Sequence, residues 1–99
     1  MRAQARMLPD GRRLHLQDGP IDLVIEAFGE VGAVRAAYAA AAERFASVLD
    51  ELCAELPILR TQARPRRLRA TGAVARRMEA AVAPFADGMF ITPMAAVAG

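Results

Sequence analysis

The chain has 99 residues, which is enough for one small domain and no more. Its single cysteine, Cys53, excludes an internal disulfide and a zinc site built from cysteines. No apolar run approaches the ~18 residues of a membrane-spanning helix, and the first residues lack the apolar core of a signal peptide. We therefore expect a cytoplasmic protein with no membrane partner.

The net charge of +2 is unevenly distributed along the sequence. Residues 1–56 carry six arginines and nine acidic residues, whereas residues 57–86 carry seven arginines and one acidic residue. Guanidinium groups bind phosphate oxygens in pairs, but no aromatic residue that could stack on a base interleaves with these arginines. We therefore predict that residues 57–70 form a solvated arginine-rich loop, and we do not favour nucleic acid as a partner. Its arginines are Arg60, Arg64, Arg66, Arg67 and Arg69.

Residues 12–28 have the pattern of a β-hairpin. Polar and apolar residues alternate over 13–17, residues 18–20 read Asp-Gly-Pro and predict a turn, and residues 21–28 predict a second strand. Val24 and Phe28 fall on the face opposite the main apolar one, so we expect that face to be partly covered too. Residues 1–8 are predicted to be irregular or an edge strand. Because a lone hairpin is marginally stable, we expect further strands. The main apolar face carries Ile21, Leu23, Ile25 and Ala27.

Two helices are predicted after the hairpin. The longer one covers residues 31–56 and is closed by Pro57; Cys53 lies beside its apolar stripe and is predicted to be a small core residue. The shorter helix covers residues 72–83, with Thr71 as its cap. The apolar stripe of the first helix is Val34, Tyr38, Ala41, Phe45, Val48, Leu52 and Leu56, and that of the second is Val74, Met78, Ala81 and Phe85.

The last stretch, residues 90–99, predicts a turn followed by a helix. Met89 and Phe90 indicate a short buried strand before it. Thr92 supplies a hydroxyl that can cap, and Pro93 is suited to the first helical position. The unpaired N–H groups of a helix start favour an anionic group. A cap with tight packing of small residues explains the same pattern, and we prefer that interpretation.

Other candidate residues support no catalytic or metal site. Asp22 and Glu26 share one strand face, and acid–base catalysis needs two carboxylates in unequal environments. A solvated strand face explains them as well, and we prefer it. His15 has no second histidine or cysteine for a metal site and no serine at a recognisable spacing.

Two segments resemble a known family. The string ITPMAAVAG, with TGAVARRMEAAVAPF before it, resembles the signature of an uncharacterised prokaryotic family allied to the ApbE flavin transferases. Val74, Arg77 and Met78 match the helix of that signature, and residues 93–99 match its turn; Thr92 departs from the glycine that the pattern prefers. The upstream RLHLQDGPIDLVIEAFG resembles the opening hairpin of the family, to which Asp22, Leu23 and Ile25 correspond.

The resemblance implies an α+β fold, of which this chain would be an N-terminal part covering less than half of the family's domain. It implies FAD, FMN or another anionic small molecule as ligand. The transferases need magnesium-holding acidic residues and a later glycine–aspartate segment that have no counterpart in these 99 residues, so we expect no catalysis by this chain alone. The ligand-binding residues implied are Arg77, Thr92, Pro93, Met94, Ala95 and Ala96.

A different class of function is also open. The alanine-rich helices suit a small interaction module that packs against another chain. The partner would be a second copy or the remaining C-terminal part of the domain.

Overall fold

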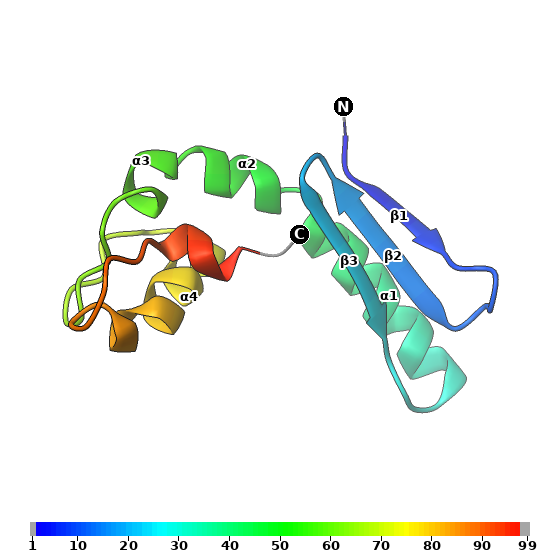
Figure 1. Ribbon diagram of the computed structural model, residues 1–99. Coiled ribbons are helices and arrows are strands. Elements are labelled where there is room, and N and C mark those ends of the chain that lie inside the picture. Colours follow the sequence, from blue (N-terminus) through cyan, green and yellow to red (C-terminus); the bar gives the residue numbers. More distant parts are fainter. Residues whose placement is uncertain (1, 98–99) are drawn as a thin grey trace. The chain divides into compact units, whose positions relative to one another are not determined.

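The computed structural model describes residues 2–97, which form two compact units (Figure 1). Unit 1 contains the described residues up to Leu49, and unit 2 runs from Asp50 to Val97. Unit 1 has an antiparallel sheet and a helix, whereas unit 2 is helical. The fold class is therefore α+β, as the sequence predicts.

The sheet of unit 1 has three antiparallel strands in the order β1-β2-β3. They are β1 (Gln4–Met7), β2 (Arg13–Asp18) and β3 (Ile21–Glu26). The β2–β3 register pairs Asp18 with Ile21, so Gly19 and Pro20 alone form the turn. Gly19 has φ +56°, which a two-residue hairpin turn requires. The predicted hairpin is confirmed, and the N-terminal segment is an edge strand.

Helix α1 (Val31–Phe45) lies across one face of this sheet (Figure 1). Its buried residues Tyr38 and Phe45 both belong to the predicted stripe, and the helix packs against β2, whose buried residues are Leu14 and Leu16. The opposite face of the hairpin is open, because Val24 is 54% exposed. The expectation that this second face is partly covered is therefore wrong.

The predicted single helix over residues 31–56 is divided into three. Helix α1 ends at Phe45, α2 covers Val48–Cys53, and α3 covers Leu56–Leu59. Pro57 explains the second break, since a proline ring clashes with the carbonyl four residues earlier, here that of Cys53. We have no comparable account of the turn at residues 46–47. The apolar stripe is nevertheless right, because its members are all buried or half-buried.

Unit 2 consists of α2 from Asp50 onward, α3, α4 (Ala73–Val82) and two short 3₁₀ helices, η1 (Ala83–Phe85) and η2 (Pro93–Ala96). The predicted helix over residues 72–83 is present within a residue at each end. Its buried face is shifted, because Ala81 and Phe85 are exposed. The core of the unit consists of Leu52, Leu59, Ala63, Ala70, Ala75, Met78, Val82, Ala83 and Pro93.

The predicted buried strand at Met89 and Phe90 is wrong. Both side chains are exposed, Phe90 by 76%, and the segment is irregular. Hydrogen bonds from Gln62 hold it in place instead: Gln62 Nε2 donates to the Met89 carbonyl at 3.2 Å, and Ile91 N donates to Gln62 Oε1 at 2.8 Å. The apolar run therefore predicted burial wrongly. The side-chain amide of Gln62 forms the backbone hydrogen bonds that a neighbouring strand would otherwise provide.

Candidate functional site

Tyr38 connects α1 by hydrogen bonds to the two residues that flank the hairpin, one just before β2 and one just after β3. Its hydroxyl donates to the carbonyl of Arg12, where β2 begins, and accepts from the N–H of Ala27 at 3.0 Å, just after β3. The ring itself is 9% exposed and belongs to the core. One side chain thus satisfies two backbone groups from segments that are 15 residues apart in sequence, and it fixes where the helix crosses this end of the sheet.

The turn between β1 and β2 is held by Asp10. Its Oδ1 accepts from the N–H groups of Arg12 and Arg13 at 2.9 and 3.1 Å, and its Oδ2 lies 2.6 Å from Arg13 Nε. Hydrogen bonds from the Arg12 backbone, then from the Arg13 side chain, lower the pKa of Asp10 from 3.8 to about 2. Gly11, with φ +69°, completes the turn. The carboxylate therefore shapes the loop that carries Arg12.

A groove opens between this turn, the ends of β2 and β3, and the first half of α1. Its volume is about 790 Å³, within the range of sites for small molecules. Leu14, Val34 and Tyr38 contribute apolar surface from the packed side. Large side chains at the opening remain in solvent: Phe28 is 86% exposed and Val31 71%. The full lining is Met7, Gly11, Arg12, Leu14, Glu26, Ala27, Phe28, Gly29, Val31, Val34, Arg35, Tyr38 and Ala39.

The groove contains three charged groups, with an excess of one positive charge. Arg12 and Arg35 line it as cations and Glu26 as an anion. Both arginines are exposed, and neither guanidinium has an ion pair within residues 2–97. An apolar cleft with guanidinium groups at its boundary suits a ligand with an apolar body and an anionic group.

The sequence did not single out this groove. The sequence identifies Tyr38 as a core residue of the helical stripe. It does not reveal the two hydrogen-bond partners of the Tyr38 hydroxyl, because these come together only in the folded hairpin. Arg35 lies outside the segments that resemble the family, and Phe28 lies in the hairpin segment but was not assigned a role there. One usable signal was present: Phe28 is a large apolar residue at the end of a strand, directly before a glycine.

Two carboxylates in unit 2 bind backbone N–H groups that a ligand anion would otherwise use. Glu55 accepts from Thr71 N at 2.7 Å and Gly72 N at 3.0 Å, at the start of α4. These backbone hydrogen bonds lower the pKa of Glu55. The predicted cap by Thr71 is therefore wrong: Gly72 is the N-cap residue, and the carboxylate of Glu55 covers the helix start.

Glu79 is the second of these carboxylates and is only 3% exposed. Its Oε1 accepts from Arg69 N at 2.9 Å and Ala70 N at 2.7 Å. This explains how a charged residue can be buried in α4, since hydrogen bonds replace its hydration. Glu79 therefore connects the C-terminal end of the arginine-rich loop to α4 by hydrogen bonds.

The predicted ligand site at residues 92–96 has the following geometry. η2 packs against α4, so the structure brings together the two segments that carry the family resemblance. Pro93 is buried, Met94 and Thr92 are half-buried, and Ala95 and Ala96 are exposed, as is Arg77 on α4. Thr92 makes no side-chain capping hydrogen bond, contrary to its predicted role. Residues 98–99 of the predicted turn-helix lie outside the described residues.

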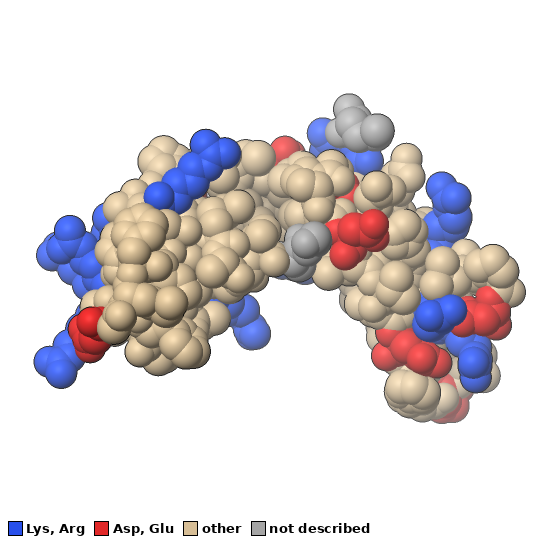
Figure 2. Space-filling view, in the orientation of Figure 1, with Lys and Arg blue, Asp and Glu red and all other residues tan. Residues whose placement is uncertain are grey.

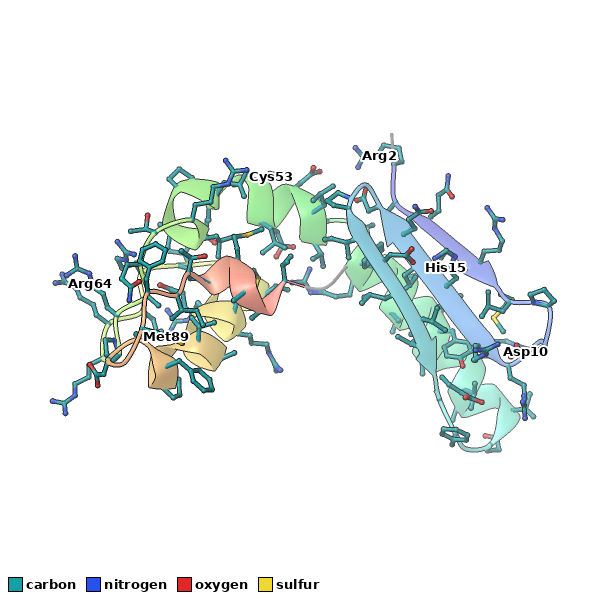
Figure 3. All side chains as sticks on the ribbon, viewed as in Figure 1. Arg2, Asp10, His15, Cys53, Arg64 and Met89 are labelled. Atoms are coloured by element: carbon teal, nitrogen blue, oxygen red, sulfur yellow. The ribbon has the colours of Figure 1, made fainter. Side chains whose placement is uncertain are left out.

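Three further candidates, His15, Cys53 and Arg64, are labelled in Figure 3, and none of them is among the residues that line the groove. His15 Nε2 lies 2.5 Å from Asp22 Oδ1 on the open face of the hairpin, a pairing that the sequence spacing did not predict. Cys53 is exposed on α2, so its predicted core position is wrong. Arg64 projects from its loop into solvent (Figure 3). Figure 2 shows basic side chains at several separate places on the visible face.

Neither a metal cluster nor a membrane span is found in the part of the chain that the structure describes. Residues 2–97 contain no group of three or more histidine, cysteine, aspartate or glutamate side chains placed to hold a metal ion. No helix among them has the length and apolar character needed to cross a bilayer.

Comparisons with known proteins give one match. A family model described as AbpE bacteria matches residues 5–99. No curated protein and no solved structure matches the chain significantly.

Proposed function

The chain belongs to the family described as AbpE bacteria, and from that premise we propose that it binds an anionic small molecule with a large apolar part in the groove of unit 1. The observation that carries this proposal is a groove of about 790 Å³ whose opening displays Phe28 and Val31 to solvent. Exposed apolar side chains gathered around one concavity are typical of a ligand or partner site. FAD and FMN, which the resemblance to the ApbE flavin transferases implies, have the required combination of an aromatic body and phosphate.

We further propose that this chain binds its ligand without transforming it. Among the residues that line the groove, Glu26 is the one carboxylate, and no histidine, serine or cysteine stands beside it to act as a nucleophile or a second acid–base group. A family relationship to the ApbE flavin transferases, a cytoplasmic location and completion by a C-terminal part of the domain belong to the same proposal.

The helix start at Thr92 is a second location for a flavin or another anion. The packing of η2 against α4 supports it, because Arg77 and residues 92–96 come from the two stretches that resemble the family signature. A four-residue 3₁₀ helix gives little alignment of peptide dipoles, so the groove is the better supported of the two.

An interaction module pairing through α1 is the candidate function from another class. Its support is a run of exposed alanines on that helix, at Ala33, Ala36, Ala37 and Ala40, which would let a second helix approach closely. The partner would be a second copy or another part of the same domain. Analytical ultracentrifugation at several concentrations tests this candidate, since it predicts a dimer that Ala37→Glu dissociates.

Equilibrium dialysis against FMN and, separately, anilinonaphthalene sulfonate tests the groove. Ala39→Phe places a ring in the groove from an exposed position on α1 and should weaken binding of both probes about tenfold. Ala40→Phe adds the same ring to the same helix outside the lining and should leave binding unchanged. Equal loss in both variants, or no saturable binding by the wild type at millimolar probe, would refute the proposal.

A further inference from the structure

Strand β3 is an edge strand of the sheet in unit 1. Its pairing with β2 closes at Asp18 and Ile21 across a two-residue turn, so this closing pair is hydrogen-bonded and the pairs then alternate. Ile21, Leu23 and Ile25 consequently bond to β2, and the backbone groups of Asp22, Val24 and Glu26 point to the open edge. The hydrogen bond from Leu8 N to the Arg13 carbonyl agrees, because it turns Arg13 toward β1 rather than toward Glu26.

Three outward N–H groups and three outward carbonyls form a template for another strand. Natural edges are commonly protected by charged side chains, a proline or a bulge; β3 has no proline or bulge, and its charged side chains are Asp22 and Glu26. Its side chains on the open face are Asp22, Val24 and Glu26, and Val24 is 54% exposed. The backbone of β3 is therefore open to strand addition, and its two carboxylates restrict which strand can be added.

The charges on this edge select the partner. Glu26 lies opposite Arg13 in the register, but Arg13 forms its ion pair with Asp10, with Nε of Arg13 2.6 Å from Oδ2 of Asp10. Glu26 has no ion pair within the described residues, and Asp22 uses only Oδ1 for His15. The edge therefore presents two carboxylates on one face, four residues apart and flanking an apolar side chain.

A second copy of β3 does not fit this edge. In full antiparallel overlap centred on Val24, Asp22 of one chain would lie opposite Glu26 of the other at both ends. Like charges directly opposite in a sheet are destabilising. A strand with basic side chains at the same positions would form two favourable pairs instead.

We propose that the open edge of β3 binds an extended polypeptide segment in which basic residues alternate with aliphatic ones. The segment adds a fourth strand, with its backbone bonded to Asp22, Val24 and Glu26. Its basic side chains lie beside the two carboxylates, and its aliphatic ones continue the apolar face formed by Ile21, Leu23 and Ile25. This interaction shares Glu26 with the lining of the groove but needs neither Arg12 nor Arg35.

Two peptides and a pair of proline variants test this edge. The probes are capped heptapeptides that alternate lysine with valine or glutamate with valine, titrated into the ¹⁵N-labelled protein. The lysine peptide should bind and shift the amides of β3, and the glutamate peptide should not bind. Val24→Pro removes the central outward N–H without removing a bond to β2, and it should weaken binding at least about tenfold.

Ala5→Pro is the matched control. Because the bonds of β2 to β1 alternate in the same way, the N–H of Ala5 also faces outward, but on the opposite edge of the sheet. Binding of the lysine peptide should be unchanged in this variant. A loss of binding equal to that in Val24→Pro would overturn the assignment to β3.

A charge exchange covers the case in which Val24→Pro does not fold. The double variant with Asp22→Lys and Glu26→Lys should bind the glutamate peptide and lose the lysine peptide. Unchanged preference in this variant would overturn the proposal, as would failure of the wild type to bind the lysine peptide at millimolar concentration. Self-association that Val24→Pro abolishes would assign the edge to a second copy and overturn it too.

Discussion

At the scale of single residues, Tyr38 determines how the helix and hairpin of unit 1 meet. Tyr38→Phe keeps the ring in the core but leaves the Ala27 N–H and the Arg12 carbonyl without their partner. We expect a loss of about 1–2 kcal/mol in the free energy of unfolding, measured by urea denaturation. The exposed Ala40→Ser change should stay within about 0.5 kcal/mol. Equal midpoints for Tyr38→Phe and wild type would show that these hydrogen bonds contribute nothing.

Asp10 gives the fold a defined dependence on acid. Its pKa in the folded chain is about 2, below the ordinary value of 3.8, so its stabilisation is complete above the ordinary value and is lost as the pH falls toward 2. Asp10→Asn removes this contribution at neutral pH and should flatten the stability profile between pH 4 and pH 2. Urea midpoints measured across that range provide the test, and an unchanged slope in the variant would contradict it.

At the residue level, the sequence predicted the apolar stripe of residues 34–56 but not the roles of two carboxylates. The stripe from Val34 to Leu56 was identified because helical spacing is a local property. The roles of Glu55 and Glu79 were not, because each carboxylate binds backbone N–H groups nine to seventeen residues away in sequence. Such pairs exist only once the loop between them has closed.

Among the structural elements, the two turns of the sheet offer a matched comparison. Gly11 and Gly19 both have positive φ, +69° and +56°, so alanine at either position costs about 1 kcal/mol. At Gly19 a Cβ would also lie 3.2 Å from Leu49 Cδ2, whereas at Gly11 it would meet nothing within 4 Å. Gly19→Ala should therefore destabilise the chain more than Gly11→Ala in urea titrations. The reverse order would contradict the packing described at this turn.

The elements themselves were predicted better than their ends. The hairpin and the helix over residues 72–83 are present, because alternation and the Asp-Gly-Pro turn are strong local signals. The second break in the long helix was missed because the effect of Pro57 reaches four residues back to Cys53, and the first break, at residues 46–47, has no signal that we recognise in the sequence. Residues 89–90 were misread as a buried strand because an apolar run does not reveal that Gln62 satisfies its backbone.

For the molecule as a whole, the arginine-rich loop is the largest concentration of charge. Arg64, Arg66 and Arg67 are all exposed, and no hydrogen bond or ion pair of their side chains is found within residues 2–97. Changing the three together to serine should alter the free energy of unfolding by no more than about 0.5 kcal/mol. Binding of RNA or DNA that weakens steeply with salt, and that the triple variant loses, would contradict the prediction of a solvated loop.

The α+β class could be predicted for the whole chain, but the groove could not. Its lining combines residues from the β1–β2 turn, the end of β3 and α1, which come together through strand pairing, the packing of α1 and the two hydrogen bonds of Tyr38. The resemblance directed attention to Thr92, although its hairpin segment, residues 13–29, contains Leu14 and residues 26–29 of the groove lining.

The central claim is that the groove, and not the helix start at Thr92, is the ligand site. The most direct test is a titration of the ¹⁵N-labelled chain with FMN and with anilinonaphthalene sulfonate, followed through the backbone amide shifts. We predict saturable shifts at Gly11, Arg12, Phe28, Arg35 and Ala39, with residues 92–96 unmoved. Shifts centred on residues 92–96, or no saturable shift anywhere at millimolar probe, would contradict the claim.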